Sequence, residues 1–407
     1  MNLHFLKKRL FQKIDHLKKI PTIWVHCSSM GETNLSEPLI KELLEERREN
    51  IIISTFTDTG YENAKKKYNN IERIEVIYFP LDIGFLLERI FQKIDFKLLI
   101  LVETEIWPNF IKKAKKYGKI IIVNGRISDR SFPRYKKIKW ILRKTLEKIS
   151  AIYTQTHVDR ERFIELGSEK EKVENLGNMK FCIDFEKYTD EEKKELKAIL
   201  KVGDKKILVL GSTRENEEKI ILEELKKNPE LLKTIAIIIV PRHLTRIEEV
   251  KNVIEKLDYT WKEFTELEEN FNLGRKEEIL EEKKQEIIIV NKMGVLRKFY
   301  SIGDCVFVGG TLVNIGGHSL LEPLFYGKTP LYGKYLQNIK TISKELNARC
   351  LGYELKENVE FVLRMKEVLE LKSEDIYKKK VEIEKLFFEN KNVVKNILGR
   401  IKNILNY

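Results

Sequence analysis

Short runs of apolar residues recur along most of the chain, and each run is followed by a polar turn and a helical pattern. The runs cover residues 22–27, 51–56, 75–79, 97–102, 119–123 and 151–154 in the first half, and residues 206–210, 235–240, 286–290, 305–308 and 329–331 in the second. Apolar strands that alternate with helices indicate a parallel sheet with helices on both faces. Two consecutive sets predict an α/β protein with two Rossmann-like, doubly wound domains that face each other across a cleft.

The same pattern predicts where the domains begin and end. We expect an N-terminal domain at residues 21–183, a charged and largely helical linker at 184–205, and a C-terminal domain at 206–385. Residues 386–407 are predicted to form a terminal helix. Residues 262–285 are dominated by Glu and Lys, and we expect them to form a solvated excursion from the second domain.

The first twenty residues predict a basic amphipathic helix. The apolar positions recur at helical spacing among lysines and an arginine, and they are Leu3, Leu6, Leu10, Ile14 and Leu17. Such a helix either lies in a membrane interface or packs on its own domain, and the sequence leaves both open. No run approaches the ~20 apolar residues of a spanning helix, and no signal-peptide pattern is visible, so we expect the chain to stay in the cytoplasm.

The charge distribution narrows the choice of partners. The formal net charge is +13, and residues 111–148 hold fourteen Lys or Arg against two acids, Asp129 and Glu147. A local field of this sign attracts phosphates of nucleic acid, anionic lipid or substrate, although lysine enrichment also follows from an A/T-rich genome. The four cysteines are widely separated and lack metal-ligand spacing, so neither a disulfide nor a metal site is predicted.

Ligands of open parallel sheets bind beyond the carboxyl ends of the strands, so the residues after each strand are the candidates for chemistry. Glu32 opens a helix after the first strand, where it is either a general base or a first-turn acid favoured by the helix dipole. Glu103 and Glu105 end a buried strand and serve either a salt bridge or a ligand site. Lys180 is either simply solvated or placed to offset the charge of a departing phosphate.

The second half carries weaker signals of the same kind. Ser212 and Glu215 have the spacing of a capping box, although the same helix start is also able to bind a phosphate. Arg242 follows a strand and suits a nucleotide. The glycine pair at 309–310 lets the backbone approach a ligand, and Glu322 is placed to accept hydrogen bonds from ribose hydroxyls.

Nine short motifs occur in one characteristic order. They are SMGE at 29–32, ETEIWPN at 103–109, NGRISDRS at 124–131, GNMKF at 177–181, GST at 211–213, VPRH at 240–243, MG at 293–294, GGH at 316–318 and EP at 322–323. Together they resemble the Kdo (3-deoxy-D-manno-octulosonic acid) transferases of lipopolysaccharide synthesis, which are inverting glycosyltransferases of the GT-B architecture. The resemblance runs from about Trp24 to the end of the second domain.

The resemblance implies a role for each matching position. Glu32 resembles the base that deprotonates the acceptor's glucosamine hydroxyl, and Glu103 and Lys180 resemble a pair that stabilises the transition state. The segments that resemble the CMP-binding site contain Pro241, Arg242, Met293, Gly294, Val295, Ser319, Leu320, Leu321 and Glu322. Val295 stands where the family usually has glutamate, and Ser319 where it has asparagine, so both donor contacts are expected to differ.

The resemblance also implies partners. The donor would be CMP-Kdo and the acceptor a lipid A precursor (lipid IVA). The protein would reach this acceptor by peripheral attachment to an anionic membrane surface on the cytoplasmic face of the inner membrane. Cationic side chains and helix N-termini would stabilise the leaving CMP, so we expect no metal or other cofactor. The rival hypotheses are a GT-B transferase that uses a UDP-sugar and a non-enzymatic basic scaffold. No recognisable nucleic-acid module accompanies the basic residues, so no nucleic-acid partner is expected.

Overall fold

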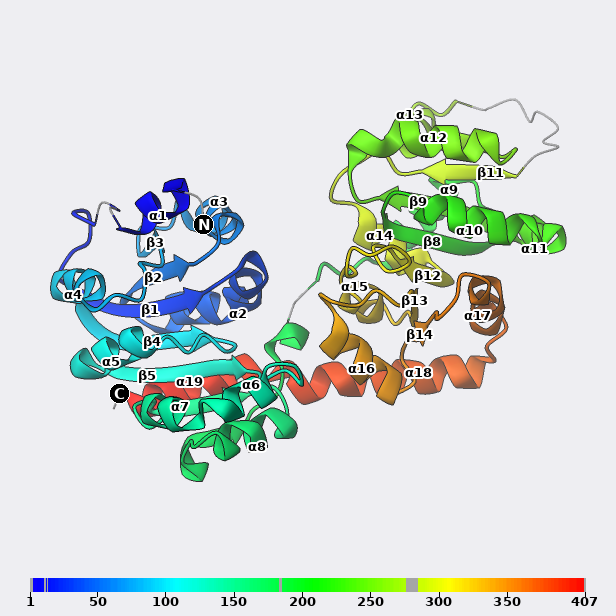
Figure 1. Ribbon diagram of the computed structural model, residues 1–407. Helices are drawn as coiled ribbons and strands as arrows, with labels where there is room; N and C mark the ends of the chain where they lie inside the picture. The colour runs from blue at the N-terminus through cyan, green and yellow to red at the C-terminus, as the bar shows by residue number, and fades with distance from the viewer. Residues whose placement is uncertain (1–2, 11, 13, 183–184, 276–284, 406–407) are drawn as a thin grey trace. The chain divides into compact units, whose positions relative to one another are not determined.

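The computed structural model describes residues 3–10, 12, 14–182, 185–275 and 285–405 (Figure 1). The chain divides into two compact units, one formed by Met1–Ile183 with Phe387–Tyr407 and the other by Asp184–Leu386. Each unit is built on a parallel β-sheet flanked by helices, so the predicted α/β class with two doubly wound domains is confirmed.

The first unit contains a seven-stranded parallel sheet of order β3-β2-β1-β4-β5-β6-β7 within the described residues. Its strands are β1 (Pro21–Cys27), β2 (Asn50–Thr55), β3 (Ile74–Tyr78), β4 (Asp95–Val102), β5 (Lys119–Gly125), β6 (Ala151–Thr154) and β7 (Val173–Asn175). Its helices are α1 (Leu3–Leu10), α2 (Met30–Glu46), α3 (Asp58–Tyr68), α4 (Gly84–Lys93), α5 (Pro108–Tyr117), α6 (Phe132–Lys137), α7 (Lys139–Leu146), α8 (His157–Glu165) and α19 (Val393–Ile404), with short 3₁₀ helices at Lys170–Lys172 and Met179–Cys182.

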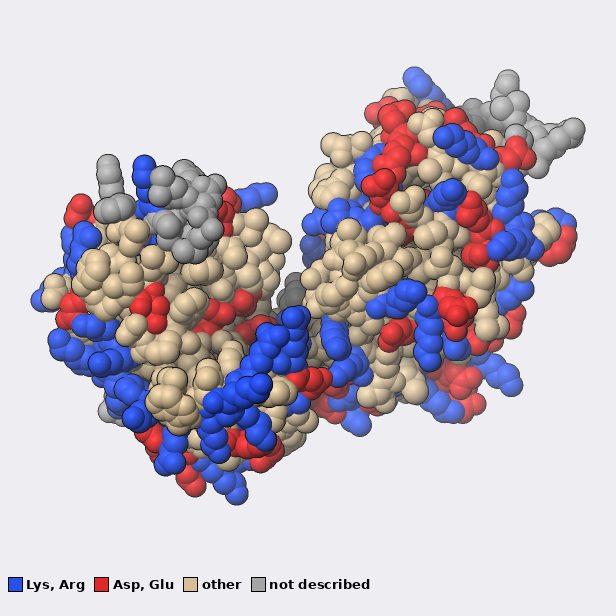
Figure 2. All heavy atoms as spheres, in the orientation of Figure 1, with Lys and Arg blue, Asp and Glu red and all other residues tan. Residues whose placement is uncertain are grey.

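Two hydrophobic cores lie on opposite faces of this sheet. Alternate residues of a strand point to opposite faces, so Ile23 and Val25 enter the core beneath α2 and α19, whereas Trp24 enters the core beneath α4 and α5. Both faces are covered, which explains why β1 is buried from Thr22 to Cys27. The basic stretch predicted at 111–148 runs through α5, β5, α6 and α7, and Figure 2 shows a band of basic side chains over α6.

The N-terminal helix is shorter than predicted. It covers Leu3–Leu10 rather than the first twenty residues. Ile14 and Leu17 are buried in the core beneath α4 rather than placed on a continued helix. The Arg9 side chain is also buried: it donates a hydrogen bond to the Phe56 carbonyl and lies over the Tyr78 ring. These contacts favour the alternative in which this segment packs on its own domain.

The second unit contains a seven-stranded parallel sheet of order β10-β11-β9-β8-β12-β13-β14 within the described residues. Its strands are β8 (Lys206–Thr213), β9 (Ile235–Pro241), β10 (Thr260–Glu263), β11 (Glu286–Ile289), β12 (Cys305–Val308), β13 (Pro330–Tyr332) and β14 (Tyr353–Glu354). Its helices are α9 (Asp190–Ile199), α10 (Glu217–Lys226), α11 (Pro229–Thr234), α12 (Ile247–Lys256), α13 (Phe264–Asn272), α14 (Leu296–Ile302), α15 (Leu321–Phe325), α16 (Lys340–Ala348) and α17 (Glu360–Leu369), with a 3₁₀ helix at Leu244–Arg246.

The segments predicted as connections belong to the units themselves. The helix expected in the linker at 184–205 is α9, which buries Leu196 and Ile199 and packs on α13 and α14. The single helix expected at 386–407 is replaced by two, α18 (Ser373–Lys391) and α19. α19 packs on α2, so the last residues of the chain complete the first unit. The separate linker and the separate C-terminal helix were therefore wrong.

The excursion expected at 262–285 is structured over most of its described length. β10 pairs with β11, and α13 follows it directly. α13 buries Phe264 and Leu267 against the unit. Residues 276–284 of this prediction lie outside the described residues.

Candidate active site

The loops that carry the candidate residues meet at the points where the strand order reverses. In the first unit the chain builds β1, β2 and β3 outward and then returns to place β4 on the other side of β1. In the second unit β8 and β12 are neighbours in the same way. Ligands of doubly wound sheets bind at the carboxyl ends of such a strand pair.

Glu32 lies in the first turn of α2, immediately after β1. Ser29 caps this helix, and the Glu32 carboxylate accepts hydrogen bonds from the Ser28 backbone N–H at 2.6 Å and from Ser29 Oγ at 3.1 Å. Burial raises the pKa of Glu32 to about 8, and the negative charges of Glu105 and Glu103 add to this effect against the two hydrogen bonds. Glu32 is thus a half-buried carboxyl that holds its proton near neutral pH.

Glu103 and Lys180 form an ion pair beside this helix. Glu103 follows β4 with a backbone φ of 61°, in the left-handed region, and its Oε1 lies 3.7 Å from Lys180 Nζ. The Lys180 segment is held by the buried Asn124 at the end of β5, whose Oδ1 accepts a hydrogen bond from the Met179 N–H at 2.8 Å. Two residues that are 77 positions apart in the sequence are therefore brought together as the resemblance implied.

Glu105 has a different partner, which the sequence did not reveal. The His26 side chain is fully buried, and its Nε2 lies 3.5 Å from Glu105 Oε2, while its Nδ1 lies 2.9 Å from Ser54 Oγ. Trp107 Nε1 donates a hydrogen bond to Glu105 at 2.7 Å. Burial acts to raise the pKa of Glu105, but the contacts with His26 and Trp107 outweigh it and the pKa is lowered. Glu105 is therefore an ionised carboxylate that His26 and Trp107 hold in place.

A cluster of cationic and imidazole groups lies at the carboxyl ends of β8 and β9 in the second unit. Arg214 Nη1 is 2.5 Å from His243 Nε2, and the Arg242 N–H donates to the Thr213 carbonyl at 3.1 Å. Burial and the charges of Arg242 and Arg214 lower the pKa of His318 to about 4, so its imidazole is neutral. Such a group of donors is suited to an anion such as a phosphate.

The glycine loop after β12 is already filled by a carboxylate. Glu217 is fully buried and accepts hydrogen bonds from the N–H groups of Arg214, Gly310, Thr311 and Leu312 at 2.7–2.9 Å. Burial raises the pKa of Glu217 and these four donors oppose the rise. Of the two amides expected to bind a ligand at 309–310, that of Gly310 is therefore held by Glu217, and that of Gly309 donates to the Gly211 carbonyl at 2.8 Å.

The prediction of a capping box at Ser212 and Glu215 was wrong, because β8 continues through Ser212. Ser212 lies inside β8 with a φ of 55°, and α10 begins five residues later at Glu217, after Asn216 in its cap position. The sequence signal for a cap was present, but the strand continues past it because Gly211 and Thr213 pair with β9.

The remaining residues that were predicted for the donor site differ in how far their side chains are exposed. Met293 is 62% exposed, Gly294 has a φ of 83°, and Val295 precedes the first turn of α14. Burial raises the pKa of Glu322, while Arg297 and Arg242 act to lower it. Ser319 is half-buried, whereas Pro241, Leu320 and Leu321 are buried, so these last three offer a ligand mainly their backbone.

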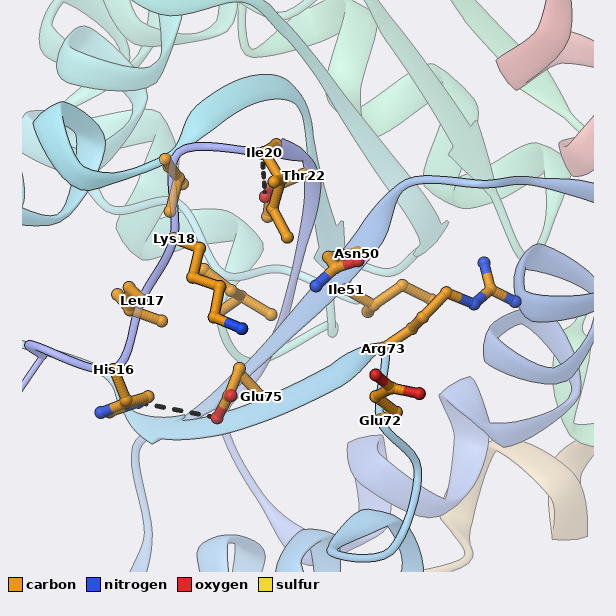
Figure 3. Close-up of a pocket in the computed structure, with 12 residues that line it drawn as sticks. His16, Leu17, Lys18, Ile20, Thr22, Asn50, Ile51, Glu72, Arg73 and Glu75 are labelled. Atoms are coloured by element: carbon orange, nitrogen blue, oxygen red, sulfur yellow. Dashed lines mark hydrogen bonds and ion pairs between the residues drawn. The ribbon is translucent and has the colours of Figure 1, made fainter.

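A cavity of about 300 Å³ lies elsewhere in the first unit. It is lined by residues at the amino-terminal ends of β1, β2 and β3, among them Thr22, Asn50 and Glu75 (Figure 3). His16 Nε2 lies 3.6 Å from Glu75 Oε2 across it. This edge of the sheet is opposite to Glu32 and Glu103, so the cavity is separate from the candidate site. Among the described residues, no three His, Cys, Asp or Glu side chains form a metal-binding group.

Solved structures with the same fold identify its class. A glycosyltransferase from Rickettsia africae matches 95% of this chain and 99% of its own with a TM-score of 0.56 at 15% sequence identity. A UDP-GlcNAc 2-epimerase from Neisseria meningitidis matches 94% of this chain and 100% of its own with a TM-score of 0.56 at 14% identity. The two doubly wound units thus define a protein of the GT-B architecture.

Sequence relatives give the family. A family model described as 3-deoxy-D-manno-octulosonic-acid transferase (kdotransferase) matches residues 4–183. The 3-deoxy-D-manno-octulosonic acid transferase of Aquifex aeolicus is 31% identical over 90% of this chain and 91% of its own length, and that of Haemophilus influenzae is 32% identical over 80% and 73%. The chain belongs to the 3-deoxy-D-manno-octulosonic acid (Kdo) transferase family.

A further relative is longer than this chain. A bifunctional glycosyltransferase/methyltransferase of Fusobacterium nucleatum is 49% identical over 99% of this chain. The chain spans 60% of the length of that protein.

Proposed function

We propose that this protein transfers Kdo from CMP-Kdo to the glucosamine hydroxyl of a lipid A precursor, with inversion at the anomeric carbon and Glu32 as the general base. Membership of the Kdo transferase family supports the sugar. The observation that carries the mechanism is the Glu32 carboxyl, half-buried at the point where the strand order reverses, with its pKa raised to about 8.

The raised pKa makes Glu32 a stronger base than an ordinary surface carboxylate. In the proposed step the ionised Glu32 takes the proton of the acceptor hydroxyl as its oxygen attacks the anomeric carbon. The bond from that carbon to the CMP oxygen breaks, and its electron pair leaves with CMP. Glu103 and Lys180, held 3.7 Å apart, would stabilise the charge that develops during this displacement.

The second unit would hold the donor. Arg242 and Arg214, with the imidazoles of His243 and His318, supply the donors that a CMP phosphate needs. Glu322 would accept hydrogen bonds from the ribose, and the predicted segments around Met293, Gly294, Val295 and Ser319 would complete the site. Since fixed cations are able to offset the charge of the leaving phosphate, we propose that the reaction needs no metal ion.

We also propose that the protein acts peripherally at the cytoplasmic face of the inner membrane. A tetra-acylated acceptor resides in a bilayer, and the basic residues of the first unit suit an anionic surface. Among the described residues, no helix is long and apolar enough to cross a membrane.

The test is mass spectrometry of lipid IVA after incubation with purified protein and freshly generated CMP-Kdo. We expect the lipid to gain Kdo, and we expect Glu32→Gln to reduce the transfer by at least about 10³-fold, in the range lost when an essential catalytic group is removed. Glu45→Gln is the matched control, because Glu45 is an exposed glutamate on the same helix. The number of added sugars would be read from the same spectra.

Each failure has a distinct meaning. Thermal shifts with CMP and with UDP report donor binding, since a ligand that binds only the folded state raises its melting temperature. If CMP stabilises the protein but lipid IVA gains no sugar, the proposed acceptor is wrong. If UDP stabilises it and CMP does not, the UDP-sugar transferase replaces the proposal. Equal transfer by the wild type and Glu32→Gln would remove Glu32 from the mechanism.

A further inference from the structure

We propose that the outer surface of α6 and α7 docks the first unit on an anionic lipid bilayer. This surface, called the α6–α7 patch below, consists of Arg134, Lys137, Ile138, Lys139, Trp140, Ile141 and Lys144. The inference deepens the proposed function, because it specifies how a lipid acceptor would be reached.

The apolar side chains of the α6–α7 patch are exposed, although α7 buries other apolar side chains in the core of its unit. Leu142 and Leu146 of α7 lie in the core of the first unit, at 5% and 1% exposure. Trp140 is 69% exposed, and Ile138 and Ile141 are 42% and 39% exposed. α7 therefore carries a second apolar surface that its own unit does not cover.

The charged part of the patch lacks compensating acids. Two neighbouring cations are paired, Arg143 with Glu147 at 2.9 Å and Lys136 with Glu165 at 2.6 Å. Over the described residues, by contrast, no carboxylate lies within ion-pairing distance of the four exposed cations of the patch, which are Arg134, Lys137, Lys139 and Lys144. Figure 2 shows a band of basic side chains over α6.

An anionic bilayer matches both parts of the patch. Lipid headgroups supply the negative charge that four unpaired cations attract. Trp140 has an amphipathic ring of the kind that settles at the headgroup level, and the two isoleucines would enter the acyl boundary beside it. A nucleic acid would satisfy the charges but leave the isoleucines in water.

The patch also adjoins the catalytic loops of the same unit. α6 follows the loop after β5, and the Thr104 hydroxyl, next to Glu103, donates a hydrogen bond to the Arg126 carbonyl of that loop. Tyr135 of α6 lies close enough to Glu105 for burial, with the Glu105 charge, to raise its pKa. A lipid held beneath the patch would therefore present its sugar near the three acids.

The N-terminal helix is less suited to this role. Lys8 contacts Asp58 and Tyr78 within the unit, and Arg9 is buried. Deleting residues 1–18 would also remove Ile14 and Leu17 from the core. Loss of membrane binding after that deletion would therefore not separate docking from unfolding.

The experiment is flotation of the full chain with phosphatidylcholine vesicles that contain phosphatidylglycerol, in the absence of any sugar nucleotide. We expect Lys137→Gln/Lys144→Gln and Trp140→Ala each to weaken binding on the order of tenfold, through lost charge and lost apolar contact respectively. Matched controls are Lys256→Gln/Lys380→Gln, two exposed lysines on α12 and α18, and Phe388→Ala, an aromatic residue of α18 that is 71% exposed. Melting temperatures verify that every variant is folded.

The outcomes separate this inference from the proposed function. Unchanged flotation of both folded patch variants would overturn the docking surface, whatever the enzyme transfers. Selective loss in the patch variants would support the surface even if no Kdo were transferred, because vesicle binding is measured without donor. Equal binding to vesicles of pure phosphatidylcholine would contradict the role of the lysines.

Discussion

Glu32, Glu103 and Glu105 are three carboxyls of one neighbourhood with different surroundings. Glu105 has His26 and Trp107 as partners and its pKa is lowered. Within the described part of the chain, the Glu32 carboxylate accepts two hydrogen bonds, both from the start of its own helix. Burial and the charges of the other two acids outweigh them and raise the pKa of Glu32 to about 8. Environments that separate the pKa values of adjacent acids allow one to act as a base while another stays ionised.

The role of general base proposed for Glu32 predicts the pH dependence of the reaction. Only ionised Glu32 accepts a proton, so kcat/KM of the wild type should rise about tenfold per pH unit below a pKa of about 8 and level off above it. In Glu105→Gln the nearby negative charge is removed, so the inflection should move to lower pH.

The measurement is a pH profile of initial rates with both variants, and Glu45→Gln serves as the control for an exposed glutamate of α2. An inflection near pH 4.5 in the wild type would contradict a base whose pKa is raised by burial. An unchanged inflection in Glu105→Gln would show that its charge does not reach Glu32.

At the scale of elements, the packing of β8 depends on one glycine. A Cβ on Gly211 would lie 2.1 Å from Tyr300 Oη, and the Tyr300 side chain is fully buried on α14. The same Cβ would lie 2.5 Å from Tyr300 Cζ and 2.6 Å from its Cε1, and α14 packs directly on β8. The close contact therefore sets the distance between α14, which follows the predicted donor segment at 293–295, and the strand that leads to Arg214.

We predict that Gly211→Ala destabilises the protein by about 1–3 kcal/mol, the usual cost of overpacking a filled core. Gly399→Ala is the control: it lies in α19 with no atom near its added Cβ, and it should be neutral or stabilise by up to about 1 kcal/mol. Chemical denaturation of both variants checks the difference. Equal stability of the two would mean that α14 shifts without cost.

The strands that the sequence did not predict are all at sheet edges. β7, β10 and β14 are short and partly exposed, so they lack the continuous apolar run of a central strand. The central strands of both sheets were predicted because both of their faces are buried. A run of apolar residues in the sequence therefore identified strands whose two faces are buried. It missed the strands that are partly exposed to solvent.

The candidate site was predictable to a similar degree. The positions of Glu32, Glu103 and Lys180 were predicted from the strand ends and the order of the motifs. The partner of Glu105 was not predicted, because His26 lies within a predicted strand of mostly apolar residues. Likewise nothing local indicated that Glu217 would bind the amides at 310–312, since those contacts join segments more than ninety residues apart.

At the scale of the whole molecule, the first unit is discontinuous in sequence. α19 contributes Ile397 and Ile401 to the core that also contains Leu39 and Leu43 of α2. Arg400 binds Glu174 with two hydrogen bonds at 2.8 and 3.0 Å. The unit that carries Glu32 is therefore incomplete without residues from the far end of the chain.

We predict that Ile401→Ala destabilises the first unit by about 2–5 kcal/mol, the cost of a large-to-small change in a core. Ile376→Ala, on an isoleucine of α18 that is 51% exposed, should change stability by less than about 0.5 kcal/mol. Hydrogen exchange of the β1 amides is the measurement, since β1 lies in the same unit. Exchange in Ile401→Ala no faster than in the control would show that α19 is dispensable.

The discontinuous first unit has a consequence for the order of events during synthesis. A ribosome adds about 5–20 residues per second, so the roughly 200 residues of the second unit take about 10–40 s to appear. Through that interval the apolar side of α2 has been made but its cover, α19, has not. The nascent chain thus exposes an apolar surface for about 10–40 s. Such a surface is a binding site for a chaperone that acts before translation ends.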